Sequence, residues 1–133
     1  MPYSAVAVIA AMWVGSLLLP VWRAGGRETM TGSGILLAGC VGMQPQWLGN
    51  PLMILVWALA LWGVSSEFLM IPLALLLLIV FAGTAMTRKI LLDEGGNIGA
   101  IERKFAGYYL WMAAVLGTAL LAVGLALVSI RNP

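Results

Sequence analysis

Histidine is absent from this 133-residue sequence, and cysteine occurs once, at Cys40. Histidine is the usual ligand of haem iron, the commonest side chain in metal sites and the usual general base, so its absence argues against each kind of site. A Ser-His-Asp triad and a Cys-His nucleophile pair are excluded. A lone cysteine forms no internal disulfide, and in an apolar stretch it acts as a small hydrophobic side chain. We therefore predict no catalytic residue, no cofactor and no metal site.

Charged side chains are also scarce, at 9% of the residues, against 62% that are hydrophobic. A water-soluble domain needs a polar exterior, so this composition predicts an integral membrane protein whose outer surface faces lipid. The seven Lys and Arg and the five Asp and Glu all lie outside four long apolar stretches. Ionisable groups inside a membrane usually mark ion paths, proton relays or catalysts, and these stretches contain none.

The four apolar stretches predict four transmembrane helices in one domain, because about 20 apolar residues cross the hydrocarbon core of a bilayer. The first stretch lacks the basic start and the cleavage site of a secretory signal, so we interpret it as a retained span. Asn50 before Pro51 is typical of a helix start. The predicted fold is all-α and polytopic, with spans at about 4–22, 51–63, 68–86 and 108–130.

Two further segments lie between these spans. Residues 35–43 are apolar but too few to cross a bilayer, so we predict an interfacial or re-entrant helix there. Residues 87–107 form the longest polar stretch, and we predict a loop. Ile98, Ile101 and Phe105 within it are also spaced as in a short amphipathic surface helix over 98–106, and both interpretations stay open.

The basic residues predict the orientation of the chain. With four spans, six of them share one side of the membrane and only Arg131 lies opposite, whereas five spans would give a split of four to three. The basic side of a membrane protein is usually cytoplasmic, so the loop 87–107 is predicted to be cytoplasmic and both termini to lie outside. Its surface pairs serve as lipid-headgroup contacts or as topology anchors. These pairs are Arg88, Lys89, Arg103 and Lys104.

Small and aromatic residues predict packing and membrane depth. Small side chains repeat every four residues in the last and first spans, which lets helix backbones approach closely. The predicted packing residues are Ala114, Thr118, Ala122 and Ala126, and Ala7, Ala11 and Gly15. Aromatic rings near span ends favour the headgroup level. The predicted interface anchors are Trp22, Trp47, Trp62, Tyr108, Tyr109 and Trp111, whereas Trp13 and Trp57 lie in mid-span and face protein or lipid.

Three short strings resemble a pattern found in a family of small, uncharacterised bacterial integral membrane proteins. They are Trp47–Leu52 (WLGNPL), Gly107–Trp111 (GYYLW) and Glu94–Gly96 (EGG). The resemblance covers about residues 34–114, and Gly49 stands where the pattern has alanine. It implies a bacterial origin, and therefore a multi-pass protein of the bacterial inner membrane, and it carries no activity.

Three classes of function remain. An accessory or assembly subunit of a larger membrane complex fits a chain with helix faces, lipid contacts and no chemistry of its own, and its partners would be membrane lipids and other integral membrane subunits, not nucleic acid. A small oligomeric transporter or channel would need polar groups inside its spans. A membrane enzyme acting on lipid headgroups would have to use Asp93, Glu94 and Glu102, whose spacing matches no Ca²⁺ loop and fits a solvated turn.

Overall fold

The computed structural model describes residues 2–26, 29–41, 45–91 and 97–131. Helices make up most of the chain, with four short strands between them. The elements are α1 (Pro2–Leu18), β1 (Pro20–Ala24), β2 (Met30–Thr31), α2 (Gly32–Val41), the 3₁₀ turn η1 (Pro45–Leu48), α3 (Gly49–Leu61), α4 (Glu67–Met86), β3 (Lys89–Leu91), β4 (Ile98–Lys104) and α5 (Ala106–Arg131).

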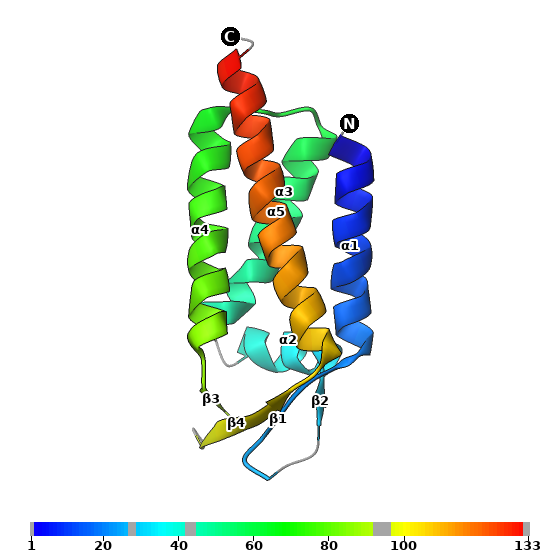
Figure 1. The fold of residues 1–133 in the computed structure, drawn as a ribbon, viewed down its shortest axis with the longest axis vertical. Helices are drawn as coiled ribbons and strands as arrows, with labels where there is room; N and C mark the ends of the chain where they lie inside the picture. The colour runs from blue at the N-terminus through cyan, green and yellow to red at the C-terminus, as the bar shows by residue number, and fades with distance from the viewer. Residues whose placement is uncertain (1, 27–28, 42–44, 92–96, 132–133) are drawn as a thin grey trace.

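Four of the helices, α1, α3, α4 and α5, stand side by side as a bundle, with α5 packed against both α1 and α4 (Figure 1). The first and last described residues lie at one end of this bundle. The strands lie at the other end, where α2 runs across the helix axes (Figure 1). We call these the terminal end and the sheet end.

The strands form one antiparallel sheet in the order β2-β1-β4-β3. β1 and β4 pair across the centre, with Trp22 opposite Lys104 and Arg23 opposite Arg103. Two arginines facing each other are unfavourable, and the Glu102 carboxylate next to them compensates by pairing with Arg23, Nε to Oε2 3.3 Å. The sheet therefore joins two chain segments that are far apart in the sequence.

The prediction of an all-α protein with four transmembrane helices is wrong in two respects. The polar segments contain strands: residues 20–22 of the predicted first span lie in β1, and the predicted loop or helix at 87–107 contains β3 and β4. Among the described residues, only α4 and α5 are long and apolar enough to cross a membrane. The chain leaves the α-helix just before Pro20, as the residue preceding a proline disfavours helix, and α3 has 13 residues, about 20 Å of rise.

The segment predicted as an interfacial or re-entrant helix at 35–43 falls on α2, which begins at Gly32, and its last two residues, 42 and 43, lie outside the described part of the chain. Two glycines allow the tight packing around this corner. A Cβ at Gly32 would lie 2.0 Å from the Ser16 carbonyl oxygen, and one at Gly107 would lie 2.7 Å from that of Pro20. The backbones of α1, β1, α2 and α5 therefore meet with no side chain between them.

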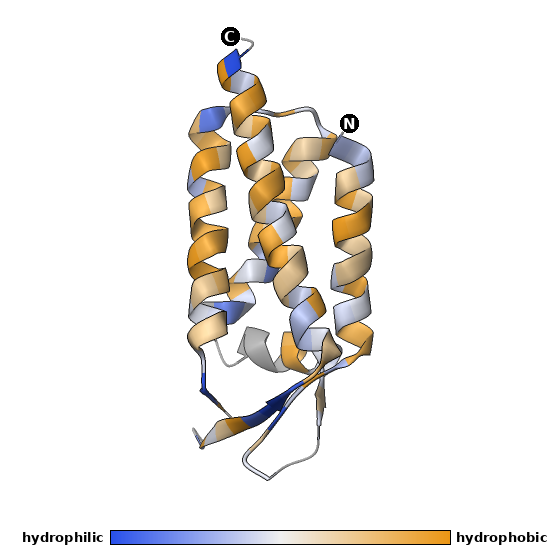
Figure 2. Ribbon diagram, in the orientation of Figure 1, coloured by the Kyte–Doolittle hydropathy of each residue, from blue (hydrophilic) through white to orange (hydrophobic). Residues whose placement is uncertain are grey.

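The bundle core is apolar and contains large residues of α3 and α4 facing small residues of α5. Met53, Met70 and Leu77 are fully buried, and Ala114 and Ala122 of α5 lie among them. Figure 2 shows that the helices are mainly hydrophobic along their length, while hydrophilic residues gather in the strands and towards the helix ends. Many large apolar side chains of these helices are exposed. Both the inside and the outside of the bundle are thus apolar.

We predict that Ala122→Leu destabilises the protein by about 1–3 kcal/mol, because three extra carbon atoms have to enter a filled core. The matched control is Val123→Leu, an enlargement on the exposed side of the same helix. Thermal unfolding of the detergent-solubilised protein, followed by circular dichroism, measures both. Equal unfolding temperatures for the two variants would show that Ala122 is not a core position.

Candidate functional site

A cavity of about 550 Å³, counting the part that is open to solvent, lies at the sheet end of the bundle. Its walls come from the last turn of α1, from β1, α2, η1 and α3, and from the adjoining ends of α4 and α5. Its polar and aromatic wall residues include Ser16, Trp22, Trp47, Asn50, Tyr108 and Trp111. The walls are mostly apolar, as those of small-molecule sites usually are.

Asn50 is the central polar residue of the cavity wall, and its side chain is buried. Its Oδ1 accepts two indole hydrogen bonds, from Trp13 Nε1 at 2.9 Å and from Trp111 Nε1 at 3.0 Å. Its Nδ2 donates to the carbonyl oxygen of Trp47 at 3.2 Å. One carboxamide therefore joins α1, η1, α3 and α5.

Gly49, the residue before Asn50, determines how closely α5 approaches α3. A Cβ at Gly49 would lie 2.9 Å from Trp111 Cζ2, so the indole of Trp111 packs directly on the backbone of α3. On the opposite side, Gln46 Nε2 donates to Thr87 Oγ1 at 2.9 Å and attaches η1 to the end of α4. The strings WLGNPL and GYYLW, which lie some 60 residues apart, thus meet at this wall.

Two indole groups of the cavity wall have no hydrogen-bond partner within the described part of the chain. Nε1 of Trp22 and Nε1 of Trp47 are both buried, and neither donates to any atom of the described residues. Trp22 is 6% exposed, and its ring lies beside that of Tyr108, with 6.4 Å between ring centroids. A buried donor that lacks a partner costs about 1–3 kcal/mol, so each of these groups needs an explanation.

Lys104 lies behind Tyr108 at the edge of the cavity. Its Nζ donates to Tyr108 Oη at 3.0 Å and to the Ala85 carbonyl oxygen at 3.5 Å, and it lies 4.3 Å from the centroid of the Tyr108 ring. The ammonium group therefore satisfies a carbonyl at the C-terminal end of α4, where a positive charge is favourable. Its hydrogen bonds hold it at this helix end.

The structure places the predicted packing residues on two different kinds of surface. Ala114, Thr118, Ala122 and Ala126 of α5 are all buried in the bundle core. In α1, however, Ala7 and Ala11 are exposed and Gly15 is half-buried. α1 meets α5 through Ile9, whose Cγ1 would lie 3.3 Å from a Cβ at Gly117. A Cβ at Gly15 would lie 3.5 Å from Leu110 Cδ1, so Gly15 also meets α5, whereas Ala7 and Ala11 are exposed and do not form the predicted packing.

The predicted interface anchors also lie in different environments. Trp22 and Tyr108 are buried in the cavity wall, and Trp47 and Trp111 are half-buried there. Trp62 and Tyr109 are exposed, near the terminal end and the sheet end respectively. The two mid-span tryptophans face protein: Trp13 and Trp57 form a T-shaped pair at 6.0 Å between centroids, and Trp57 Nε1 donates to Thr118 Oγ1 at 3.0 Å.

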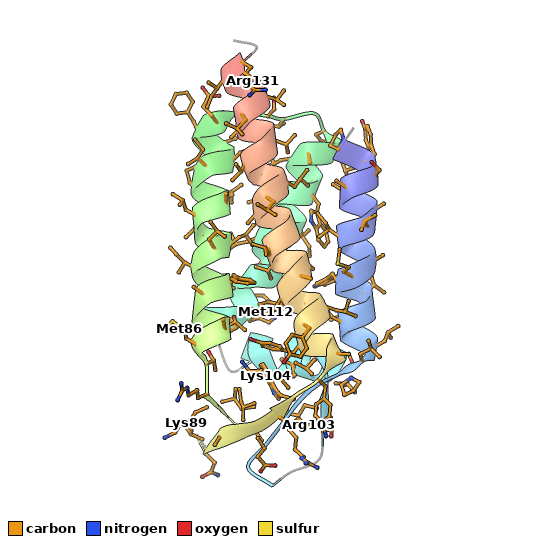
Figure 3. The ribbon with its side chains drawn as sticks, in the orientation of Figure 1. Met86, Lys89, Arg103, Lys104, Met112 and Arg131 are labelled. Atoms are coloured by element: carbon orange, nitrogen blue, oxygen red, sulfur yellow. The ribbon has the colours of Figure 1, made fainter. Side chains whose placement is uncertain are left out.

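The predicted headgroup residues lie at the sheet end, where Figure 3 shows Lys89, Arg103 and Lys104, with Arg131 at the opposite end. Arg88, Lys89 and Arg103 are exposed, and Lys104 is half-buried.

Of the three carboxylates considered for chemistry, Asp93 and Glu94 lie outside the described residues. Glu102 is paired with Arg23 and accepts from the Gly26 backbone N–H at 2.7 Å. Within the described part of the chain, no three His, Cys, Asp or Glu side chains are grouped as metal ligands would be.

The sequence predicted most of the aromatic residues of this wall but not the cavity. The prediction of Asn50 as the cap of its helix is wrong, because α3 begins at Gly49 and Leu48 is its N-cap residue. The buried role of Asn50 was not predicted either. A signal was present, because Asn50 is an amide flanked by apolar residues, and a polar side chain buried beside indoles needs hydrogen-bond partners. Nothing in the sequence indicates that the indoles of Trp22 and Trp47 lack a partner, because a sequence does not show whether an indole N–H is hydrogen-bonded.

We predict that Asn50→Leu destabilises the protein by about 2–4 kcal/mol, because it leaves the N–H groups of Trp13 and Trp111 without an acceptor. Gln46→Met is the matched control, because it removes an amide for which one hydrogen bond is described, at the same end of the bundle. We expect it to lower the free energy of unfolding by about 1 kcal/mol. Thermal unfolding in detergent compares them. If Asn50→Leu lowers the stability no more than Gln46→Met does, Asn50 does not have the central role given to it here.

Comparison of the chain with protein families, with curated proteins and with solved structures finds no match. The resemblance to small bacterial integral membrane proteins stays a prediction, and the function has to be argued from the geometry.

Proposed function

We propose that this protein is a multi-pass protein of the bacterial inner membrane and acts as a non-catalytic accessory or assembly subunit of a larger membrane complex. The observation that carries the proposal is the apolar outer face of α4 and α5. Within their most apolar 18-residue windows, 22% and 33% of the residues are buried inside the molecule, whereas the core helix of a soluble protein is mostly buried.

Large apolar side chains cover this outer face. Phe68 and Ile79 of α4 are 83% and 66% exposed, and Leu120 of α5 is 63% exposed. Continuous apolar surface of this kind is rare on water-soluble monomers and marks contact with lipid or with another protein. Lipid or the helices of a partner subunit therefore cover α4 and α5.

The interior supports a role without chemistry. In the middle of the bundle, the described hydrogen bonds between helices join neutral groups, as between Trp57 and Thr118. Glu67 lies at the terminal end of α4, where its carboxylate accepts from Ser129 Oγ. Ion paths and intramembrane catalysts usually place ionisable groups within the spans, and this bundle keeps the described ones at its two ends.

Helix contacts in a membrane favour small residues between larger ones, and the outer face has this pattern at two places. On α5, exposed Gly124 lies between Leu120 and Val128, and on α4, exposed Gly83 lies one turn from Ile79. A Cβ at Gly83 or Gly124 would have no atom within 4 Å. Because small residues let a second backbone approach closely, we assign the face around Gly124 to a transmembrane helix of the partner subunit.

The orientation follows from the basic residues. Lys89 and Arg103 lie at the sheet end and Arg131 at the terminal end (Figure 3), and Arg23 lies in β1 of the same sheet. Because the basic side of a membrane protein is usually cytoplasmic, this distribution favours a cytoplasmic sheet.

For the orientation, we predict that cysteines introduced at Ser66 and at Ile98, in a Cys40→Ser background, label from opposite sides of the membrane. Ser66 precedes α4 at the terminal end and makes no side-chain cap hydrogen bond, and Ile98 is exposed in β4. A membrane-impermeant maleimide should label position 66 in intact spheroplasts and position 98 after lysis. Labelling of both positions in intact spheroplasts would contradict the proposed crossing by α4.

For the assembly, we predict that Gly124→Leu reduces the yield of co-purifying membrane proteins at least tenfold, because its side chain fills the space needed for a close helix contact. Gly124→Ala is the matched control and should keep the partner. A Cβ at position 124 meets no atom of the described residues within 4 Å, and the neighbouring surface is exposed, so both variants should leave the monomer's unfolding temperature unaffected or raised.

The measurement is the mass of the detergent-extracted particle, with identification of its chains. Distinct partner chains that are lost in Gly124→Leu support the subunit. A ring of identical copies would favour the alternative of an oligomeric transporter or channel, and a wild-type particle containing a single copy of this chain would contradict both.

A further inference from the structure

We propose that the outer face of the sheet binds a phosphate monoester between the guanidinium groups of Arg23 and Arg103. The outer face is the side of the sheet that points away from the helix bundle. The proposal concerns the isolated chain and requires no partner subunit. It therefore stands or fails separately from the assembly role.

The first argument is that the fold sets two positive charges directly opposite each other. Arg23 of β1 and Arg103 of β4 are paired residues of the two central strands, and like charges at such positions repel. Trp22 and Lys104 form the next pair along these strands. Trp22 is buried and the Lys104 ammonium reaches the Ala85 carbonyl oxygen, so this pair faces the bundle. Because side chains alternate along a strand, the two arginines point away from the bundle.

The second argument is that one carboxylate balances these two charges. Glu102 uses its Oε2 for Arg23 Nε, at 3.3 Å, and its Oε1 for the backbone N–H of Gly26, at 2.7 Å. Arg103 forms no ion pair within the described part of the chain, and its guanidinium lies over the Phe105 ring, 5.2 Å from the centroid. Both arginine side chains are exposed. The outer face therefore keeps a positive charge that a bound anion can reach.

The third argument is the shape of the donors. Each arginine presents its N–H groups as a planar fork that pairs with two oxygen atoms of a carboxylate or a phosphate. One fork occupies both oxygens of a carboxylate. A phosphate monoester has three free oxygens and a charge between −1 and −2 at neutral pH, so it can accept from both arginines at once. The opposed pair therefore favours a phosphate monoester over a carboxylate.

Two sources of phosphate reach this face. The sheet lies where the apolar helices end (Figure 2), which is the level of lipid headgroups, so phosphatidic acid is one source. The outer face also points away from the bundle, so a soluble phosphate monoester is the other. Lys89 and Arg103 lie at this end of the molecule (Figure 3) and attract either anion.

The test uses the full chain in dodecyl maltoside, a detergent without phosphate, and calorimetry in a phosphate-free buffer. Dioctanoyl phosphatidic acid, glycerol 3-phosphate and dioctanoylglycerol are titrated separately, so the probes carry chains and phosphate, phosphate alone or chains alone. We expect phosphatidic acid to bind at one site per chain and dioctanoylglycerol to show no saturable binding. Glycerol 3-phosphate that binds at least tenfold more weakly than phosphatidic acid identifies a lipid source, and a smaller difference identifies a soluble one.

The variants Arg23→Gln and Arg103→Gln should each weaken phosphate binding about tenfold, the effect of one lost hydrogen bond to a charged group. Arg103→Lys keeps the charge and loses the fork, and it should weaken binding about threefold. Lys89→Gln is the matched control, because it removes the same charge from an exposed side chain of the same sheet that lies opposite Ala100 rather than an arginine. It should change the affinity less than twofold.

Stability gives an independent measurement. Without phosphate, Arg103→Gln should leave the unfolding temperature unchanged or raise it, because the variant removes repulsion across the strands. The phosphate probe should raise the unfolding temperature of the wild type and of Lys89→Gln, and it should raise that of Arg103→Gln much less.

Three results would overturn the proposal. Equal weakening by Lys89→Gln and Arg103→Gln would show only a general attraction between charges. Dioctanoylglycerol that binds as tightly as phosphatidic acid, or no saturable binding of either phosphate probe, would show that this face does not recognise phosphate. A hexaglutamate peptide that binds as tightly as the phosphate probes would assign the face to an acidic protein segment instead.

Discussion

The carboxamide of Asn50 is the interaction on which the sheet end of this protein depends. An apolar bundle has little to fix how its helices rotate or slide, because one hydrophobic contact resembles another and lipid competes with both. A buried acceptor shared by two indoles has one geometry, and it sets Trp13 of α1 and Trp111 of α5 at the same level of α3. The cavity lies beside this junction, so its walls are held by directional bonds.

The helical part of the fold was accessible from the sequence because its cause is local. Unbroken apolar runs bounded by polar turns predict helices directly, and the predicted spans 68–86 and 108–130 fall within α4 and α5. The strands were not accessible in this way. β4 contains Glu102, Arg103 and Lys104, which form no alternating pattern, and besides nearby β3 it pairs with β1, more than 70 residues earlier. Pairing between distant segments leaves no trace within either segment.

The candidate site was only partly predictable for a related reason. Trp22, Tyr108 and Trp111 were expected at the membrane interface because aromatic rings near span ends have that preference. Close backbone contacts at Gly32 and Gly107 decide which of these rings lie inside the protein. The sequence shows the two glycines but does not show which backbone packs against them. The same residues that anchor many membrane proteins in lipid here build the wall of a cavity.

The pairing of β1 with β4 has a consequence for how the molecule forms. During synthesis α1, α3 and α4 are all complete before Ile98–Lys104 emerges, so β1 has no central partner until the chain is about three-quarters made. Contacts between such distant segments form late, after the loop-closure entropy has been lost. Assembly of this protein therefore has to wait for β4 and for α5, which follows it, and Trp22 of β1 acquires its place beside Tyr108 of α5 only after both have been made. The wall of the cavity is incomplete until the chain has been made as far as Trp111.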